Sequence, residues 1–128
     1  MKITEQQAVE CMAEMMGYTV TGVKYKGGGI EVYRETPVVD DPIFGNNSGR
    51  SNLNPLHDAN HALECLEAYC DNPRLWKQGG WWHVVILEND VYKDPWQASH
   101  PDPNYAAITA LCSAQMGVQV EITPEGDE

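Results

Sequence analysis

The residues best suited to chemistry lie in the stretch NPLHDANHALECLEAY, which begins at Asn54. Within it, His57-x-x-x-His61-x-x-Glu64 places two imidazoles and a carboxylate on adjacent turns of one helix face. Such a set can hold Zn²⁺ or another divalent ion, which would make the protein a metal-dependent enzyme. The pattern is not HExxH, because Asp58 follows the first histidine where a metalloprotease has its glutamate. We favour the alternative, an exposed polar helix face, and predict no metal site and no cofactor.

The same stretch predicts a helix on which the other elements are expected to pack. Asn54 is a suitable N-cap, Pro55 suits the first turn, and Pro73 follows shortly after the expected end at Tyr69. The side of this helix that faces away from the histidines is apolar and is expected to be buried; it comprises Ala59, Ala62, Leu63, Leu66, Tyr69 and Cys70.

Two further helices are predicted from their end signals. Thr4 and Gln7 form a capping box that opens an amphipathic segment closed by Gly17. Asp102 is the expected N-cap of a helix over residues 104–116 that stops at Gly117. The four cysteines, Cys11, Cys65, Cys70 and Cys112, show no CxxC spacing, and we expect them to be reduced and buried.

Strand-forming residues make two predicted hairpins. The first runs over residues 18–33 with Gly27, Gly28 and Gly29 as a flexible tip, because no phosphate-binding helix follows these glycines. The second joins residues 79–87 to 91–96 through the turn residues Glu88, Asn89 and Asp90. Residues 84–87 are apolar on both alternating faces, which predicts a central strand. Residues 118–122 predict a short C-terminal edge strand, and the acidic tail 123–128 is expected to fray.

Candidate binding residues fall in two regions. Residues 36–53 predict a long loop, in which Asp40 and Asp41 are expected to form a solvated turn. Here Arg34, Asn46, Asn47 and Arg50 could bind an anion, and Phe44 could anchor the loop to the protein or a partner. Around the second hairpin, Trp76, Trp81 and Trp96 supply either core volume or an interface anchor.

Charge and composition exclude several function classes. A formal net charge of −11 disfavours binding to duplex nucleic acid and to anionic membranes. No apolar run approaches a membrane span, and the first residues lack the apolar core of a signal peptide, so we expect a cytoplasmic protein. Its 128 residues predict a single domain, residues 1–128.

The order of predicted elements is α-ββ-α-ββ-α, which makes the fold class α+β. Together with this order, the stretches NPLHDANHALECLEAY, WWHVVIL and ALCSAQMGVQVE resemble the phage ABA sandwich domain family, a group of small phage and prophage proteins. The resemblance covers most of the chain and implies a helix–sheet–helix sandwich around a mainly antiparallel sheet. It implies no catalytic residues.

Three functions follow as hypotheses. The first is a non-enzymatic phage accessory protein that binds and blocks a host protein, such as a component of bacterial defence. Its acidic surface would favour a basic partner and would flank an exposed aromatic patch. The second is a homo-oligomer that sequesters a small nucleotide-like signal, in a pocket where Arg34, Arg50 or Arg74 meets a Trp or Tyr. The metal-dependent enzyme is the third.

Overall fold

A computed structural model describes residues 1–25, 28–41, 43–69, 73–86 and 95–123. These residues form three helices and eight strands, so the predicted α+β class is confirmed. The elements in chain order are β1 (Lys2–Thr4), α1 (Glu5–Met15), β2 (Thr19–Lys24), β3 (Ile30–Arg34), β4 (Gly49–Leu53), α2 (Ala59–Tyr69), β5 (Arg74–Gln78), β6 (Trp81–Ile86), β7 (Trp96–His100), α3 (Pro103–Met116) and β8 (Glu121–Thr123).

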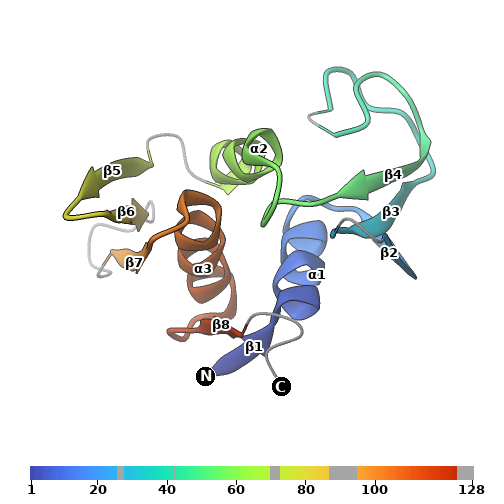
Figure 1. The fold of residues 1–128 in the computed structure, drawn as a ribbon. Coiled ribbons are helices and arrows are strands. Elements are labelled where there is room, and N and C mark those ends of the chain that lie inside the picture. Colours follow the sequence, from blue (N-terminus) through green and yellow to red (C-terminus); the bar gives the residue numbers. More distant parts are fainter. Residues whose placement is uncertain (26–27, 42, 70–72, 87–94, 124–128) are drawn as a thin grey trace.

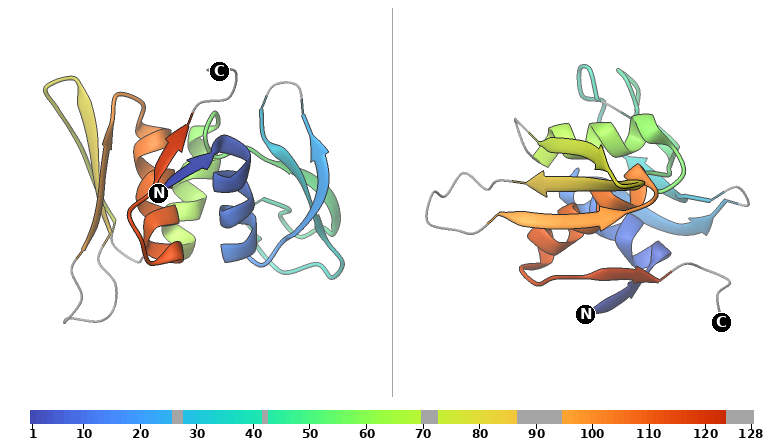
Figure 2. Two further views of the ribbon diagram at one scale, coloured as in Figure 1. Left: turned by 90° about the horizontal axis from the view of Figure 1, so that it is seen from below. Right: turned by 60° about the vertical axis from the view of Figure 1, so that its left-hand side comes forward.

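The three helices lie between two antiparallel sheets (Figures 1 and 2). Strands β2, β3 and β4 form one sheet on the side of α1, and β5, β6 and β7 form the other against α3. A short parallel pair, β1 with β8, joins the two ends of the described chain. Helices and sheets therefore pack in layers as expected, but the layer order is sheet–helices–sheet, with helices inside in place of a single central sheet.

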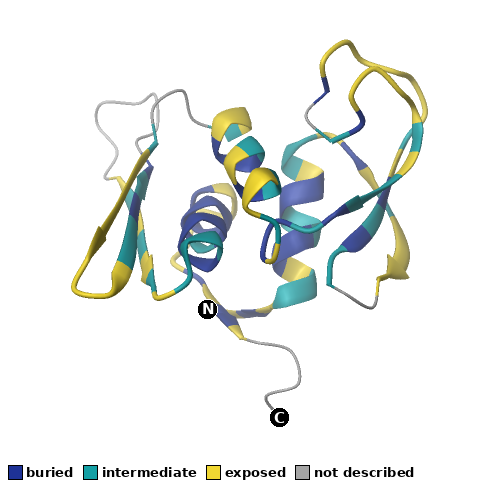
Figure 3. Ribbon diagram, turned by 45° about the horizontal axis from the view of Figure 1, so that its top comes forward, coloured by how far each residue is buried: buried dark blue, intermediate teal, exposed yellow. Residues whose placement is uncertain are grey.

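Helix α3 explains this order, because it is buried on every side (Figure 3). Its buried residues run almost without interruption from Tyr105 to Ala114. A helix that is apolar all round needs cover in every direction. That cover comes from β6, β7, α1 and α2, so α3 is the helix on which the other elements pack, and the expectation that α2 has this role is wrong.

Local signals set both ends of α1 and α3 correctly. Thr4 and Gln7 form the predicted capping box, with Thr4 Oγ1 accepting from the Gln7 N–H at 3.0 Å. Asp102 caps α3 through the Asn104 N–H at 2.8 Å, and Gly117 ends it in a left-handed conformation. These caps satisfy backbone groups that a helix end leaves without partners.

Helix α2 begins at Ala59, four residues later than predicted from Pro55. Asp58 is the reason, because its Oδ1 accepts from the N–H groups of Asn60 at 2.9 Å and His61 at 3.3 Å and so caps the helix. The predicted buried side is correct for Ala62 and Leu66, but Leu63 is 48% exposed and Cys65 is buried instead. Ala59 is exposed, and Cys70 lies outside the described residues.

Strand pairing produces several elements that were not predicted. The last part of the predicted loop 36–53 is strand β4, which pairs with β3. Strand β5 follows α2 directly and pairs with β6, which is the predicted central strand. The partner on its other side is β7, at Trp96–His100, whereas the predicted turn at residues 88–90 and most of the strand 91–96 lie outside the described residues. The C-terminal strand, β8, exists but pairs with β1.

Among the described residues, no helix is long and apolar enough to cross a membrane.

Two residues of the hairpin tip between β2 and β3, Gly28 and Gly29, lie close to β4 and to the residues before α2. Gly28 and Gly29 have positive φ values of 95° and 86°. A Cβ atom on Gly29 would lie 2.3 Å from Asn52 Oδ1 and 2.8 Å from the Leu53 carbonyl oxygen. Glycine is therefore required there both by conformation and by the close approach of β4. Gly27 is not among the described residues.

We expect Gly29→Ala to lower the free energy of unfolding by about 2–4 kcal/mol, as backbone strain adds to a clash with the Leu53 carbonyl. Gly22→Ala is the matched control, because Gly22 also has a positive φ, 95°, but a Cβ there would meet nothing within 4 Å. The control should cost about 1–2 kcal/mol, the strain alone. Urea unfolding of both variants measures the difference, and equal losses would show that the tip is not packed as described.

Candidate functional site

The most exposed aromatic surface lies on the outward side of β5, β6 and β7. Alternation along the strands turns Val84 and Ile86 inward, where they are buried, and turns Trp81, His83 and Val85 outward. The register pairs Trp76 with His83 and Gln78 with Trp81, so the outward side of β5 carries Arg74, Trp76 and Gln78. We call Trp76, Trp81 and His83 the aromatic face.

The two tryptophans of this face are partly free of cover. Trp76 is 42% exposed and Trp81 is 48% exposed. The Trp76 ring stacks on His83 with centroids 5.3 Å apart and planes 22° apart, and His83 Nδ1 lies 2.7 Å from Ser99 Oγ. Stacking on His83 restrains the Trp76 ring and so lowers the entropy cost of binding a partner through it.

The aromatic face carries no carboxylate, although the chain as a whole has a net charge of −11. The outward positions of the three strands are Arg74, Trp76, Gln78, Trp81, His83, Val85, Gln97 and Ser99, none of which is acidic. The expected patch flanked by acids stays a prediction, because the segments that adjoin these strands in the chain and contain Asp71, Glu88, Asp90 and Asp94 lie outside the described residues. Trp96, the third predicted tryptophan, is partly buried and packs against the core from the inward side of β7.

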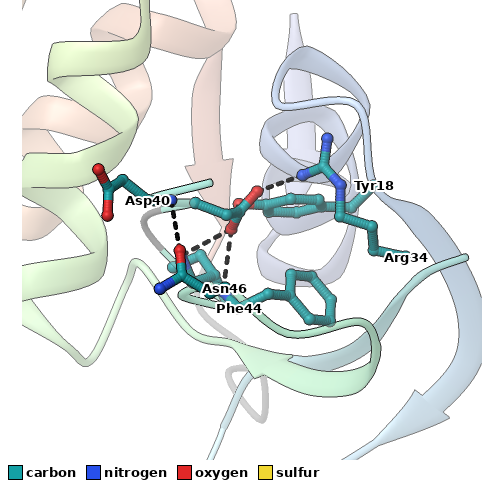
Figure 4. A network of polar contacts seen from close by, with 7 residues as sticks. Tyr18, Arg34, Asp40, Phe44 and Asn46 are labelled. Carbon is teal, nitrogen blue, oxygen red and sulfur yellow. Dashed lines mark hydrogen bonds and ion pairs between the residues drawn. The ribbon is translucent and has the colours of Figure 1, made fainter. Parts of the chain in front are cut away.

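The loop residues predicted as a binding set are organised around Asp41 (Figure 4). Asp41 Oδ1 accepts hydrogen bonds from Tyr18 Oη at 2.8 Å and from the N–H groups of Ile43 and Phe44, both at 2.9 Å. Asp41 Oδ2 is paired with the Arg34 guanidinium, whose Cζ lies 5.4 Å from the centre of the Tyr18 ring. The Phe44 ring packs edge-on to Tyr18 with centroids 5.1 Å apart. We call this set the Asp41 network.

The electrostatics of this network favour an ionised Asp41 and a neutral Tyr18. Burial alone would raise the pKa of Asp41, but the hydrogen bonds from Phe44, Tyr18 and Ile43 and the charge of Arg34 outweigh it, and the pKa is lowered. Burial and the bond to Asp41 raise the pKa of Tyr18 well above its ordinary value. Asp41 is only 7% exposed, so the predicted solvated turn is wrong for this residue and holds only for the exposed Asp40.

Two members of the predicted anion-binding set, Arg34 and Asn46, already contact other residues of the protein. The charge of Arg34 is neutralised by Asp41, and Asn46 Oδ1 accepts from the Asp40 N–H at 2.8 Å. The Arg50 side chain is 73% exposed, and its Nε lies 3.7 Å from Glu31 Oε1. Asn47 is exposed. Phe44, 7% exposed, anchors the loop to the protein's own core. Arg34 and Tyr18 do meet here, as the nucleotide hypothesis requires, but their contacts with Asp41 stabilise the loop.

The two histidines of the predicted metal set point to different neighbours. His61 Nδ1 accepts the Asn54 N–H at 2.9 Å, which turns the ring toward the residues before α2. The ring of His57 is edge-on to Tyr105, with centroids 6.4 Å apart. The described part of the chain holds no group of three or more His, Cys, Asp or Glu side chains that could bind a metal ion.

A small cavity that the sequence did not suggest lies between α1, the β2–β3 tip and the residues before α2. It has a volume of about 50 Å³, and Glu5, Asn54 and His57 are among its lining residues. Tyr105 donates a hydrogen bond to Glu5 beside it, and Asn54 Oδ1 is buried without a hydrogen-bond partner among the described residues. A volume of this size accommodates a few water molecules, at roughly 10–15 Å³ each, one of which can satisfy Asn54. It is too small for a ligand of nucleotide size.

Comparison with known proteins gives no relative: no family model, no curated protein and no solved structure matches the chain. The resemblance to the phage ABA sandwich family therefore stays a hypothesis.

We expect Asp41→Asn to lower the free energy of unfolding by about 2–4 kcal/mol, because the neutral side chain leaves Arg34 without its counter-charge. Since the pKa of Asp41 is lowered by folding, its contribution is complete above the ordinary value of 3.8 and is lost as the pH falls below it. The wild-type protein should therefore lose more stability than the variant between pH 5 and pH 2, measured by chemical unfolding.

Asp40→Asn is the matched control. Asp40 is adjacent and exposed, and Asn tolerates its positive φ of 56°. This control should stay within about 0.5 kcal/mol of the wild type. If both variants lost the same stability with the same pH profile, the Asp41 network would have no special role.

Proposed function

We propose that this protein is a non-enzymatic binding protein and that the aromatic face is where it holds a partner protein. The observation that carries the proposal is the exposure of Trp76 and Trp81 on the same side of two paired strands, with the Trp76 ring stacked on His83. Tryptophan supplies a large contact area at a low entropy cost and is enriched among the residues that dominate binding energy at protein interfaces.

The acidic surface has a separate part in this proposal. The described outward positions of β5, β6 and β7 carry no carboxylate, and the excess negative charge of the chain acts at long range by attracting a partner whose overall surface is basic. Long-range attraction raises the association rate constant, whereas the contacts at the face determine the dissociation rate constant. A basic host protein with an apolar or aromatic contact surface has the matching chemistry.

The biological setting rests on the sequence resemblance alone. If the chain is a phage or prophage accessory protein, the partner is a host protein in the cytoplasm of the infected cell. Blocking a component of bacterial defence is then a role that suits a small protein for which the resemblance implies no catalytic residues. The alternative is a homo-oligomer in which the same face is covered by a second copy of the chain.

The test is affinity capture from bacterial lysate on immobilised protein, followed by binding kinetics with the recovered partner. We expect the double variant Trp76→Ala/Trp81→Ala to raise the Kd about 1,000-fold, since tryptophans at interface centres contribute about 2 kcal/mol each when truncated. The loss should fall on the dissociation rate constant. Raising the salt concentration should instead lower the association rate constant.

Tyr33→Ala is the matched control, because Tyr33 is a 37% exposed aromatic residue on β3, in the opposite sheet. It should leave the Kd unchanged. Equal weakening by the control, or full binding by the double variant, would place the interface elsewhere. Native mass measured before capture identifies the alternative: a dimer that the double variant converts to monomers would mean that the face binds its own copy.

A further inference from the structure

Two cysteines from distant parts of the chain meet where α1 crosses α3. Cys112 is fully buried on α3, with Sγ 3.7 Å from the Ala8 carbonyl oxygen of α1. Its thiol is within hydrogen-bonding reach of the Cys11 sulfur, one turn further along α1. Both are free cysteines. The contact between the two helices therefore places these two thiols together.

Only one of the two thiols is open to solvent. Cys11 is partly exposed and lines a surface groove of about 400 Å³. Glu10, Glu14 and Met116 also line this groove. A small reagent can therefore reach Cys11 from outside, whereas Cys112 is buried.

The pKa of Cys11 is also the lower of the two. A hydrogen bond from the Cys112 thiol lowers the pKa of Cys11 below its ordinary value and outweighs the opposing effects of burial and of Glu14. Thiolate is the nucleophilic form of cysteine, so this hydrogen bond favours reaction at Cys11. Cys65 provides the contrast, because burial raises its pKa to about 12 and its sulfur packs 3.6 Å from Met16 Sδ.

We propose that Cys11 and Cys112 form a reversible disulfide, in which Cys11 is oxidised by a hydroperoxide and Cys112 then resolves the oxidised sulfur. A partly exposed, activated thiol beside a second cysteine is the arrangement found in redox-sensing proteins. This site is separate from the aromatic face and does not depend on the function proposed for it.

The reaction balances in two steps. The Cys11 thiolate attacks one oxygen of hydrogen peroxide, the O–O bond breaks, and sulfenic acid and hydroxide are formed. The Cys112 sulfur then attacks the Cys11 sulfur, the S–O bond breaks, and the Cys112 proton and the departing hydroxide leave as water. Overall, two thiols and one peroxide give one disulfide and two water molecules, with sulfur oxidised and peroxide oxygen reduced.

The first step prepares the second. The negative charge of Cys11 and the hydrogen bond to it are among the causes that raise the pKa of Cys112, and both disappear when Cys11 becomes a neutral sulfenic acid. Burial then remains as the main obstacle to a Cys112 thiolate. The groove also selects the oxidant, because Glu10 and Glu14 repel an anionic disulfide such as oxidised glutathione but not neutral peroxide.

The test treats the reduced wild-type protein with stoichiometric hydrogen peroxide, blocks the remaining thiols, and maps the disulfides by mass spectrometry. We expect a Cys11–Cys112 disulfide that dithiothreitol reverses, and a rate several-fold higher with peroxide than with oxidised glutathione. Cys65→Ser should form the same disulfide at the wild-type rate. A different pairing, or oxidation of Cys11 that stops short of a disulfide, would overturn the proposal.

Two variants separate the roles of the cysteines. Cys11→Ser should lose the reaction at this site, whereas Cys112→Ala should accumulate a Cys11 sulfenic acid that a dimedone probe traps. A Cys112→Ala protein that reacts at the wild-type rate and gives no trapped sulfenic acid would refute the assignment. Circular dichroism establishes whether each variant is folded. If a variant is not folded, the disulfide mapping of the wild-type protein decides the proposal.

Discussion

The burial of α3 on all sides is the constraint on which the rest of the structure depends. Its small residues allow α1 and α2 to approach closely on one side while β6 and β7 cover another. The buried Ser113 hydroxyl is satisfied within the same packing, because Ser113 Oγ donates to the Thr109 carbonyl at 2.8 Å and accepts the Val120 N–H at 3.1 Å. That second bond guides the chain into β8, which pairs with β1 immediately before the cap of α1. The ends of the described chain are thus tied together around the helix.

Because the helices are used for the interior, the outer sides of the two sheets become the main surfaces of the molecule. The sheet β5–β6–β7 packs on α3 through β6 and β7, and every residue of β5 is exposed. Trp76 lies on the outward side of this strand, away from α3, where its ring stacks on His83. The other sheet differs, since its loop is tied down by Asp41, Tyr18 and Phe44. The first sheet therefore presents two exposed tryptophans, whereas the loop beside the second sheet buries Phe44 against Tyr18.

The sequence predicts well what neighbouring residues decide. The caps at Thr4 and Asp102, the ends of α1 and α3, and the central position of β6 all follow from signals within a few residues. The sequence predicts poorly the features that depend on contacts between residues far apart in the chain. Strands β4 and β5, GRSNL and RLWKQ, have no apolar alternation, and only the backbone pairing offered by β3 and β6 makes them strands. The Asp41 network also depends on residues distant in the chain, because Tyr18 directly precedes β2 and Arg34 ends β3.

The two surfaces that carry function in these proposals lie on different sides of α3, which limits how they can influence each other. The thiol pair lies where α3 meets α1, and the aromatic face lies beyond β6, which covers α3 from another direction. Coupling between two sites requires an element with two arrangements that both sites bias. Helix α3 is close-packed on all sides by residues such as Ala106, Ile108 and Leu111, each 0% exposed, so it cannot move without opening the core. The structure therefore favours oxidation and partner binding that act independently, the first fastening α1 to α3 and the second using a face that stays in place.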